Sequence, residues 1–281
     1  MSTPTEGRTP AFADGSAGDA DYGAIGEQYS RYRRADPRIA ARILEALGGA
    51  RSVLNVGAGA GSYEPTDRKV TAVEPSASMR AQRPPGLPRA VDAVAEHLPF
   101  DDASFDAVMT TFSVHQWSDL DAGLAELRRV SRGPVVILSC DPDELGRFWL
   151  GQYAPEVIAI EARRYPAISR LAQALDRPTT VGSVPIPLDC TDGFGEAYYG
   201  RPEAFLDPAA RRANSAWSFV DAATAARYVA ALAADLESGE WDRRFGALRS
   251  QPEFDGSLRL IVGWIDPLRE WRASSCCAHR G

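Results

Sequence analysis

Two short apolar runs in the first third of the chain predict buried strands on either side of a glycine-rich turn. Val53–Val56 has the bulk of a buried strand, and it breaks into glycines at positions 57, 59 and 61. A second run, Val70–Val73, ends in Glu74. Glycines let the backbone approach a ligand without Cβ interference, and the residues after them are expected to open a helix whose free N–H groups face that ligand. This arrangement predicts a nucleoside-binding α/β domain.

The spacing of the glycines and the acid narrows the choice of nucleoside. Dinucleotide-binding turns read G-x-G-x-x-G, whereas here the third glycine falls one residue early, at Gly61, and Ser62 occupies the usual slot. No Gly-Lys-Ser/Thr follows the glycines, which excludes a P-loop. Glu74 follows Gly57 by 17 residues, close to where a carboxylate holds ribose hydroxyls. The turn therefore argues against a nicotinamide dinucleotide.

Several motifs in order resemble the class I S-adenosylmethionine-dependent methyltransferases over roughly residues 20–140. The G-x-G-x-G turn is similar to the family's first motif, and Glu74-Pro75-Ser76 with Met79 is similar to the second. Ala95-Glu96 and Leu98-Pro99-Phe100, followed by Phe105-Asp106, resemble the ubiquinone-biosynthesis-type branch of small-molecule methyltransferases. The resemblance implies a Rossmann-like, doubly wound α/β fold with seven mostly parallel strands, an antiparallel C-terminal hairpin and a mainly helical lid insertion. It places the fourth strand at Phe105–Phe112 and the fifth at Val135–Leu138.

The same resemblance implies S-adenosylmethionine as the cofactor and S-adenosylhomocysteine as the product. In the family, the acid after the second strand takes the ribose, and the following side chains cover one adenine face. The cofactor-binding residues expected on this basis are Gly57, Ala58, Gly59, Gly61, Glu74, Pro75, Met79, Ala95, Glu96, Phe112 and Ser113. Arg33 is expected either to pair with the methionine carboxylate or to lie on a solvated surface.

One position departs from the family pattern. Family members commonly have an acid just before the Ala-Glu pair, where it accepts a hydrogen bond from the adenine amino group, but this chain has Val94 there. Asp92 could substitute only if the loop shifts. Adenine is then expected to be recognised by backbone groups near Ala95 and by packing against Met79 and Leu98.

Composition and charge set further limits. The 281 residues, 44% of them hydrophobic, can bury one substantial core. We expect a single domain at 20–272 between flexible tails at 1–19 and 273–281.

A net charge of −7 argues against a nucleic-acid partner. The chain has neither 18 uninterrupted apolar residues nor a signal-peptide pattern, so no membrane span and a cytoplasmic location are expected. Four scattered cysteines and three scattered histidines predict no metal site, and the sequence indicates no oligomeric state.

After the cofactor-binding core at 20–140, the pattern predicts a helix and an edge strand within 141–188. A lid is expected at 189–255, and the last strand and the end of the domain at 256–272. Apolar positions at three- and four-residue steps predict a helix over 142–162. Further helices are expected near 167–175 and 221–236. Val184–Leu188, with two prolines, predicts the edge strand, and Leu258–Val262 the last strand. In the class I fold these two strands form a hairpin, so residues 189–255 would be an insertion beside the strand ends, over the acceptor.

His115 and two tyrosines are the candidate catalytic residues. Methyl transfer from a sulfonium is an in-line displacement, so the protein mainly aligns the nucleophile and excludes water. His115 lies just past the fourth strand and is the candidate general base, with a structural loop histidine as the alternative. Tyr22 and Tyr29 suit the site because a phenol ring attracts a cation and its hydroxyl can orient an acceptor. The candidate substrate-binding residues, which could equally form core, are Trp117, Phe194, Tyr198, Tyr199 and Trp217.

These features predict methyl transfer to a small aromatic or heteroaromatic, indole-like metabolite, as in natural-product tailoring. Carbon, nitrogen and oxygen all stay open as the acceptor atom. The rival interpretations are a quinone-ring or carboxylate methyltransferase and a non-catalytic protein that binds S-adenosylmethionine. An acceptor cavity without polar groups would favour the non-catalytic interpretation.

Overall fold

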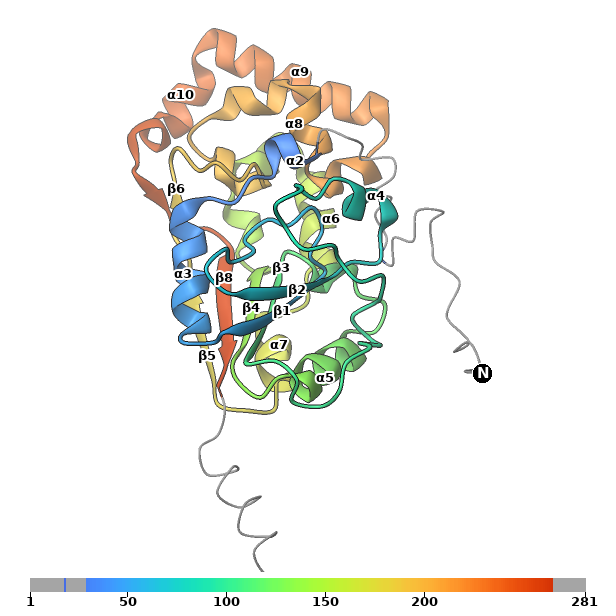
Figure 1. Cartoon of the computed structure of the whole chain (residues 1–281). Coiled ribbons are helices and arrows are strands. Elements are labelled where there is room, and N and C mark those ends of the chain that lie inside the picture. The colour runs from blue at the N-terminus through green and yellow to red at the C-terminus, as the bar shows by residue number, and fades with distance from the viewer. Residues whose placement is uncertain (1–17, 19–28, 265–281) are drawn as a thin grey trace, which may run out of the picture.

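A six-stranded sheet forms the centre of the molecule. The computed structural model describes residue 18 and residues 29–264. The strand order is β2-β1-β3-β4-β8-β5, with β2, β1, β3 and β4 parallel and β8 antiparallel to both of its neighbours (Figure 1). The bounds are β1 Ser52–Val56, β2 Lys69–Val73, β3 Ala107–Thr111, β4 Val135–Cys140, β5 Thr179–Ser183 and β8 Leu258–Gly263. The predicted α/β fold, with a mostly parallel sheet and an antiparallel C-terminal hairpin, is confirmed.

The central sheet has six strands in the described part of the chain, so the predicted count of seven is wrong. At the edge beside β2, where a seventh strand would lie, the chain makes only one parallel bridge, between Val73 and Val91. Prolines at 84, 85 and 88 precede this bridge. Because proline has no N–H to donate to a ladder, the segment cannot extend the pairing.

The edge strand next to β8 is also displaced from its predicted position. β5 covers Thr179–Ser183, whose β-branched residues suit an extended strand. The predicted segment, Val184–Leu188, instead contains the two-residue strand β6 (Ile186–Pro187), which pairs with β7 (Glu253–Phe254) in a separate small sheet. The insertion between β5 and β8 therefore begins and ends at this two-stranded sheet.

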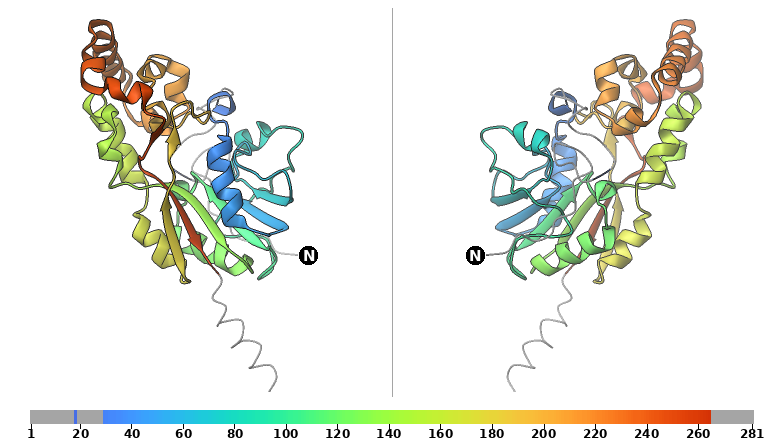
Figure 2. Two further views of the ribbon diagram at one scale, coloured as in Figure 1. Left: turned by 90° about the vertical axis from the view of Figure 1, so that its left-hand side faces the viewer. Right: turned by 90° about the vertical axis from the view of Figure 1, so that its right-hand side faces the viewer.

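Helices cover the sheet on both faces (Figure 2). Successive side chains of β3 and β4 point alternately into one core and the other. One face packs against α3 (Pro37–Leu47), which Asp36 caps and which buries Ile39, Ile43 and Leu47. The other face packs against α5 (Leu120–Val130) and α7 (Ile168–Ala174). Burial on both faces explains why these strands are apolar runs without a polar alternation.

The helix expected after the glycines is absent. Residues 57–68 connect β1 to β2 as an irregular loop, in which Tyr63 has φ 64° and Pro65 interrupts the backbone hydrogen bonding. A buried ion pair holds this loop: Arg83 Nη2 lies 2.8 Å from both carboxylate oxygens of Glu64. Asn55 Nδ2 of β1 donates to Glu64 as well, at 3.1 Å. Side-chain bonds thus replace the helix as the support of the turn.

The segment predicted as a helix over 142–162 forms one only in its second half. It begins with the 3₁₀ turns η2 (Leu145–Arg147) and η3 (Trp149–Gln152), and α6 (Pro155–Arg164) starts at a proline suited to a first helical position. The helices expected near 167–175 and 221–236 are present as α7 and α9 (Ala222–Ser238).

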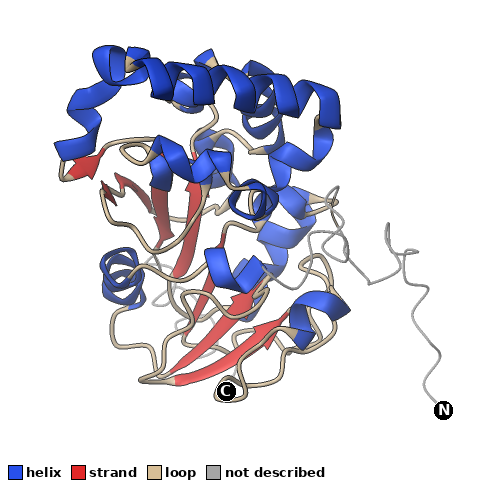
Figure 3. Cartoon of the chain, turned by 90° about the horizontal axis from the view of Figure 1, so that it is seen from above, coloured by secondary structure: helices blue, strands red, loops and turns tan. Residues whose placement is uncertain are grey.

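The insertion between β5 and β8 lies at the carboxyl ends of the parallel strands (Figures 1 and 3). Its aromatic core packs on Trp149 of η3, which makes edge contacts with Phe205 and Trp241 at centroid distances of 5.8 Å and 5.3 Å. Besides α9, it contains α8 (Pro208–Arg212), α10 (Glu240–Phe245), and the 3₁₀ turns η4 (Gly195–Tyr198), η5 (Pro202–Leu206), η6 (Ser215–Phe219) and η7 (Gly246–Ser250). Three short elements complete the fold: α2 (Tyr29–Tyr32), α4 (Ala77–Ala81) and η1 (Val114–Gln116).

The buried ion pair under the glycine turn generates a stability prediction. Arg83→Ala leaves the Glu64 carboxylate buried without a cation, so the free energy of unfolding should fall by about 3–5 kcal/mol in denaturant titrations. The control is Arg243→Ala, which removes an exposed pair with Glu240 and should cost less than about 1 kcal/mol. Equal losses for the two variants would contradict a supporting role for Arg83.

Candidate active site

The turn after β1 lies against the end of β3. Gly57 has φ 67°, and a Cβ atom there would lie 1.8 Å from Ser113 Oγ, so only glycine fits. Gly57, Ala58 and Gly59 line a crevice between the carboxyl ends of β1, β2 and β3. Gly61 is not among the lining residues, because it faces Leu87 and Arg83 behind the turn. The first two glycines thus shape the crevice, and the third packs the loop.

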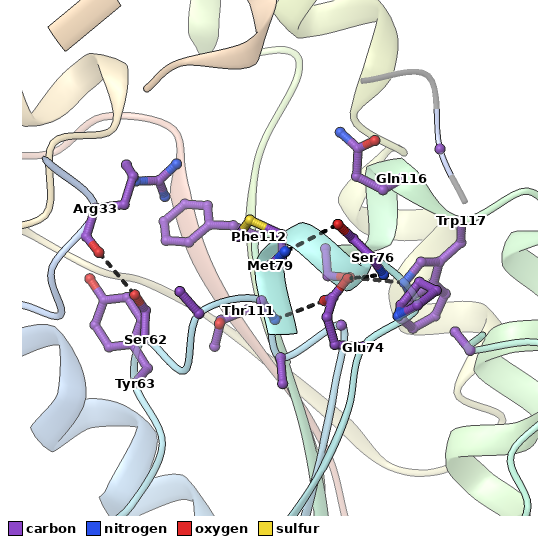
Figure 4. A pocket seen from close by; sticks show the side chains of 18 of the residues that line it. Arg33, Ser62, Tyr63, Glu74, Ser76, Met79, Thr111, Phe112, Gln116 and Trp117 are labelled. Carbon is purple, nitrogen blue, oxygen red and sulfur yellow. Dashed lines mark hydrogen bonds between the residues drawn. The ribbon is translucent and has the colours of Figure 1, made fainter. Parts of the chain in front are cut away.

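Glu74 lies at the end of β2 on the floor of this crevice (Figure 4). Its carboxylate accepts hydrogen bonds from the backbone N–H of Gly59 at 2.8 Å and of Ser76 at 2.9 Å. Burial raises the pKa of Glu74, while these two N–H groups oppose the rise. The two bonds fix the orientation of an acid whose remaining lone pairs can accept from a ligand hydroxyl.

The rest of the crevice brings together most of the predicted cofactor residues. Met79 of α4 lies beside Gly59, and Pro75, Ala95, Phe112 and Ser113 are also part of the lining. Glu96 lines the crevice too, but one of its oxygens accepts from the N–H groups of Ser118 and Asp119 at the start of α5. Trp117, predicted as a substrate residue, lies in this crevice and donates from Nε1 to Ser113 Oγ at 3.0 Å.

Arg33 is buried at one end of the crevice. Its Nε lies 2.6 Å from Asp192 Oδ1 in the insertion, and its side chain is only 12% exposed, so the solvated-surface alternative is wrong. Nη1 donates to Tyr29 Oη at 3.3 Å, and the guanidinium carbon lies 5.1 Å from the Phe112 ring centroid. Although burial acts in the opposite direction, Asp192 holds the pKa of Arg33 well above its ordinary value.

Two residues that the sequence did not single out, Tyr63 and Asp192, belong to the same wall. Tyr63 Oη donates to Asp192 Oδ2 at 2.9 Å, and both side chains are buried. Ser62 Oγ donates to the Arg33 backbone carbonyl at 3.0 Å. No local pattern could have found this group, because its members come from three distant parts of the chain. The other lining residues that sequence reasoning did not assign are Gly18, Ala60, Ser76, Thr111 and Gln116.

A second cavity adjoins the first, and Tyr29, Arg33 and Phe112 line both. Phe112, directly after β3, has φ 50°, a conformation that is rare for a non-glycine residue and that clusters at functional sites. Aliphatic and aromatic side chains from η2, η3, α6 and η6 enclose the second cavity. Its other lining residues are His115, Cys140, Leu145, Phe148, Leu150, Val157, Ile158, Glu161, Tyr165, Phe194, Gly195, Glu196, Ala213, Asn214, Ser215, Ala216 and Trp217.

His115 lies in this second cavity, on η1. Its ring contacts the Tyr165 ring, with centroids 4.3 Å apart. Burial, with further contributions from Arg164 and Arg33, holds the pKa of His115 well below its ordinary value. The imidazole is therefore neutral at physiological pH and can accept a proton.

The structure divides the remaining predicted substrate residues. Phe194 and Trp217 line the second cavity, as the sequence predicted for a substrate pocket. Tyr198 and Tyr199 do not: Tyr198 packs on Phe205, and Tyr199 stacks on Phe254 with centroids 5.0 Å apart. Both tyrosines belong to the core of the insertion. The sequence could not show this, because the aromatic residues of this segment follow no regular period. Tyr22 lies outside the described residues.

Asp92, which the sequence offered in place of the missing adenine-binding acid, lies away from the crevice. Asp92 is 69% exposed, and it pairs with Arg80 at 2.8 Å. Neither Asp92 nor Val94 is a lining residue. The shift of the loop that Asp92 would need is therefore not present, and Met79 and Ala95 remain as the walls for a flat, apolar ring.

Together, these features suit an adenosine-containing ligand at the sheet edge of an α/β domain. The fixed carboxylate suits a ribose diol, and the glycine turn lets the backbone approach it closely. Within residues 29–264, no group of three potential metal ligands comes together. Over the same range, no helix is both long and apolar enough to cross a bilayer.

Comparison with known proteins supports a methyltransferase. A profile described as a methyltransferase domain matches residues 54–137. A candidate methyltransferase from an antibiotic biosynthesis pathway of Anabaena variabilis shares 29% identity, covers 84% of this chain and 100% of its own, and superposes with a TM-score of 0.78. No protein with a curated description matches. The chain therefore contains a methyltransferase domain and has the class I fold of S-adenosylmethionine-dependent methyltransferases.

A more distant structure shares the fold. It is an S-adenosylmethionine-dependent methyltransferase of Thermotoga maritima, described as a candidate histamine N-methyltransferase, with 17% identity and a TM-score of 0.50. The match covers 85% of this chain and 92% of that protein. At this level of identity the similarity concerns the fold alone.

The position of Glu74 generates a binding prediction. Glu74→Gln should weaken S-adenosylhomocysteine binding at least tenfold in calorimetry, because an amide cannot accept two ligand hydroxyls as a carboxylate does. Asp92→Asn is the matched control and should leave the affinity within twofold, since Asp92 lies outside the crevice. A loss of less than threefold for Glu74→Gln would remove the carboxylate as the ribose anchor.

Proposed function

We propose that this enzyme transfers a methyl group from S-adenosylmethionine to a small aromatic or heteroaromatic metabolite. The observation that carries this proposal is the wall shared by the two cavities, formed by Tyr29, Arg33 and Phe112. A donor in the glycine-lined crevice and an acceptor in the second cavity would meet at that wall. Direct displacement needs this contact, because donor and nucleophile must be in line and shielded from water.

The character of the second cavity supports an aromatic acceptor. Phe148, Phe194 and Trp217 offer ring faces, and aliphatic residues fill most of the remaining lining. Apolar cavities with a few polar groups are typical of small-molecule sites. The similarity to a candidate methyltransferase of an antibiotic pathway supports a role in natural-product tailoring.

The residues of the shared wall suit a cationic donor. S-adenosylmethionine, when bound, supplies an electrophilic methyl group on a positively charged sulfur. Tyr29 and Phe112 present aromatic rings, which attract cations. Asp192 neutralises Arg33, so the guanidinium adds little repulsion at the wall. Gly57, Glu74 and the neighbouring crevice residues would hold the adenosine part.

His115 would serve as the general base. It lines the acceptor cavity, and burial keeps its imidazole neutral. A neutral imidazole can take the proton that an N–H, O–H or acidic C–H acceptor loses during transfer, an effect worth roughly 10²- to 10⁴-fold in rate.

Polar groups in the acceptor cavity disfavour a non-catalytic role. Glu161 and Glu196 disfavour a carboxylate acceptor, because like charges repel.

Calorimetry followed by a transfer assay tests the function. S-adenosylmethionine and S-adenosylhomocysteine should bind, and NAD should not. With methyl-labelled S-adenosylmethionine, mass spectrometry should detect label on at least one member of a panel of indoles, phenols and aromatic amines. Binding of NAD alone would overturn the cofactor assignment. Donor binding without label transfer to any aromatic compound would overturn the acceptor class.

Replacing the candidate base tests the mechanism. His115→Ala should lower kcat at least tenfold and leave the affinity for S-adenosylhomocysteine within twofold, because the side chain lines only the acceptor cavity. Since burial lowers the pKa of His115, the wild-type kcat should show no loss from its protonation between pH 8 and pH 6.5.

An exposed histidine provides the control. His97→Ala should leave kcat unchanged, because His97 lies at the surface and outside both cavities. An unaltered kcat for His115→Ala would remove His115 from the mechanism.

A further inference from the structure

A buried carboxylate in the acceptor cavity has no part in the mechanism described above. Glu196, on η4 of the insertion, lines the cavity and is 3% exposed. Its two oxygens accept from the backbone N–H of Ser257 at 3.1 Å and 3.0 Å, and Oε2 also accepts from Ser257 Oγ at 2.5 Å. A Cβ atom on Gly256 would lie 2.8 Å from Oε1. The loop before β8 therefore holds the carboxylate in one orientation.

This carboxylate has no cationic side chain within 4 Å among residues 29–264. The charge of Arg259 acts to lower the pKa of Glu196, but its guanidinium donates to the carbonyls of Gly256 and Leu258 and lies 3.7 Å from Asp141. Arg33 lines the same cavity and is bound to Asp192. A buried acid without a cation is costly, and such groups are enriched at functional sites.

The surroundings of Glu196 make the cavity negative on balance. Glu161 of α6 lies in the same lining, but Arg164 Nη1 lies 3.9 Å from its Oε2 and offsets its charge. Tyr29, His115, Cys140 and Tyr165 carry no charge near neutral pH, so the negative charge of the lining comes mainly from Glu196. Burial, together with the field of Glu161, raises the pKa of Glu196 to about 7, against the opposing bonds from Ser257. A bound cation would lower the pKa of Glu196, because its charge would offset both the burial and the repulsion from Glu161.

We propose that Glu196 binds a protonated amine of the acceptor, so that the preferred substrates are aromatic amines of the arylalkylamine kind. This inference rests on the proposed function. The aromatic lining would take the ring, and Glu196 would fix the other end of the molecule by a charge-assisted hydrogen bond. Such an anchor selects one class of acceptor, because a neutral or acidic analogue leaves the buried carboxylate uncompensated.

Matched ligand pairs test the amine preference directly by binding. Calorimetry on the S-adenosylhomocysteine complex compares tryptamine with 3-methylindole and N-acetyltryptamine, and phenethylamine with N-acetylphenethylamine. At pH 8, at least one amine should bind ten or more times as tightly as its neutral partners. Amines that bind no more tightly than their neutral partners, or do not bind, would overturn the proposal.

A substitution assigns the preference to Glu196. Glu196→Gln can still accept from the Ser257 N–H, and it should reduce binding of the preferred amine at least tenfold while leaving the neutral analogue within twofold. Glu237→Gln, at an exposed position of α9, is the control and should change neither. Equal losses for amine and neutral analogue would indicate a purely structural role and overturn the proposal.

The pH dependence provides a second readout that folding defects do not mimic. Because Glu196 ionises near pH 7, wild-type affinity for the amine should rise roughly tenfold from pH 6 to pH 8, while the amine itself stays protonated. Glu196→Gln should remove this rise, and a rise that persists in the variant would assign it to another group. Loss of S-adenosylhomocysteine binding, or of methyl transfer to every acceptor, would count against the proposed function instead.

Discussion

The buried ion pair between Arg33 and Asp192 holds the site together. Arg33 follows α2, Asp192 belongs to the insertion, and Tyr63 from the glycine loop donates to the same carboxylate. An antiparallel bridge joins the backbones of Arg33 and Asp192 as well. Three segments far apart in the chain therefore converge at the wall between the two cavities. Removing either charge would leave the other buried alone, which is far more costly than losing a surface pair.

The ion pair also sets the electrostatics of that wall. A lone guanidinium beside Phe112 would oppose a positively charged donor, and Asp192 cancels most of that field. The acceptor side is different, because Glu196 is buried there without a cation of its own. The two cavities thus differ in charge: Arg33 and Asp192 neutralise each other at the shared wall, whereas Glu196 has no cationic partner in the second cavity among residues 29–264.

The glycine turn, which we propose binds the nucleoside, is supported by side chains and not by a helix. A helix after the glycines would provide N–H groups and rigidity, but this chain has an irregular loop there. Glu64 and Arg83 give the loop rigidity by a buried pair, and Glu74 is oriented by backbone N–H groups from either side. The sequence predicted the helix wrongly because glycine spacing specifies the turn, while the element after it depends on what packs behind the loop.

The sequence by itself determined the α/β class, the glycine turn, the position of Glu74 and the resemblance to methyltransferases, because these features depend on residues that are close along the chain. It also placed His115, Phe194 and Trp217 among the candidates for the reaction site. It could not separate Phe194 from Tyr199, since both lie in one aromatic segment without a regular period. Only the tertiary structure decided that Tyr199 is core, that Arg33 pairs with Asp192 and that Glu196 faces the acceptor cavity. Each of these outcomes depends on contacts between segments that meet only when the insertion folds over the ends of β3 and β4.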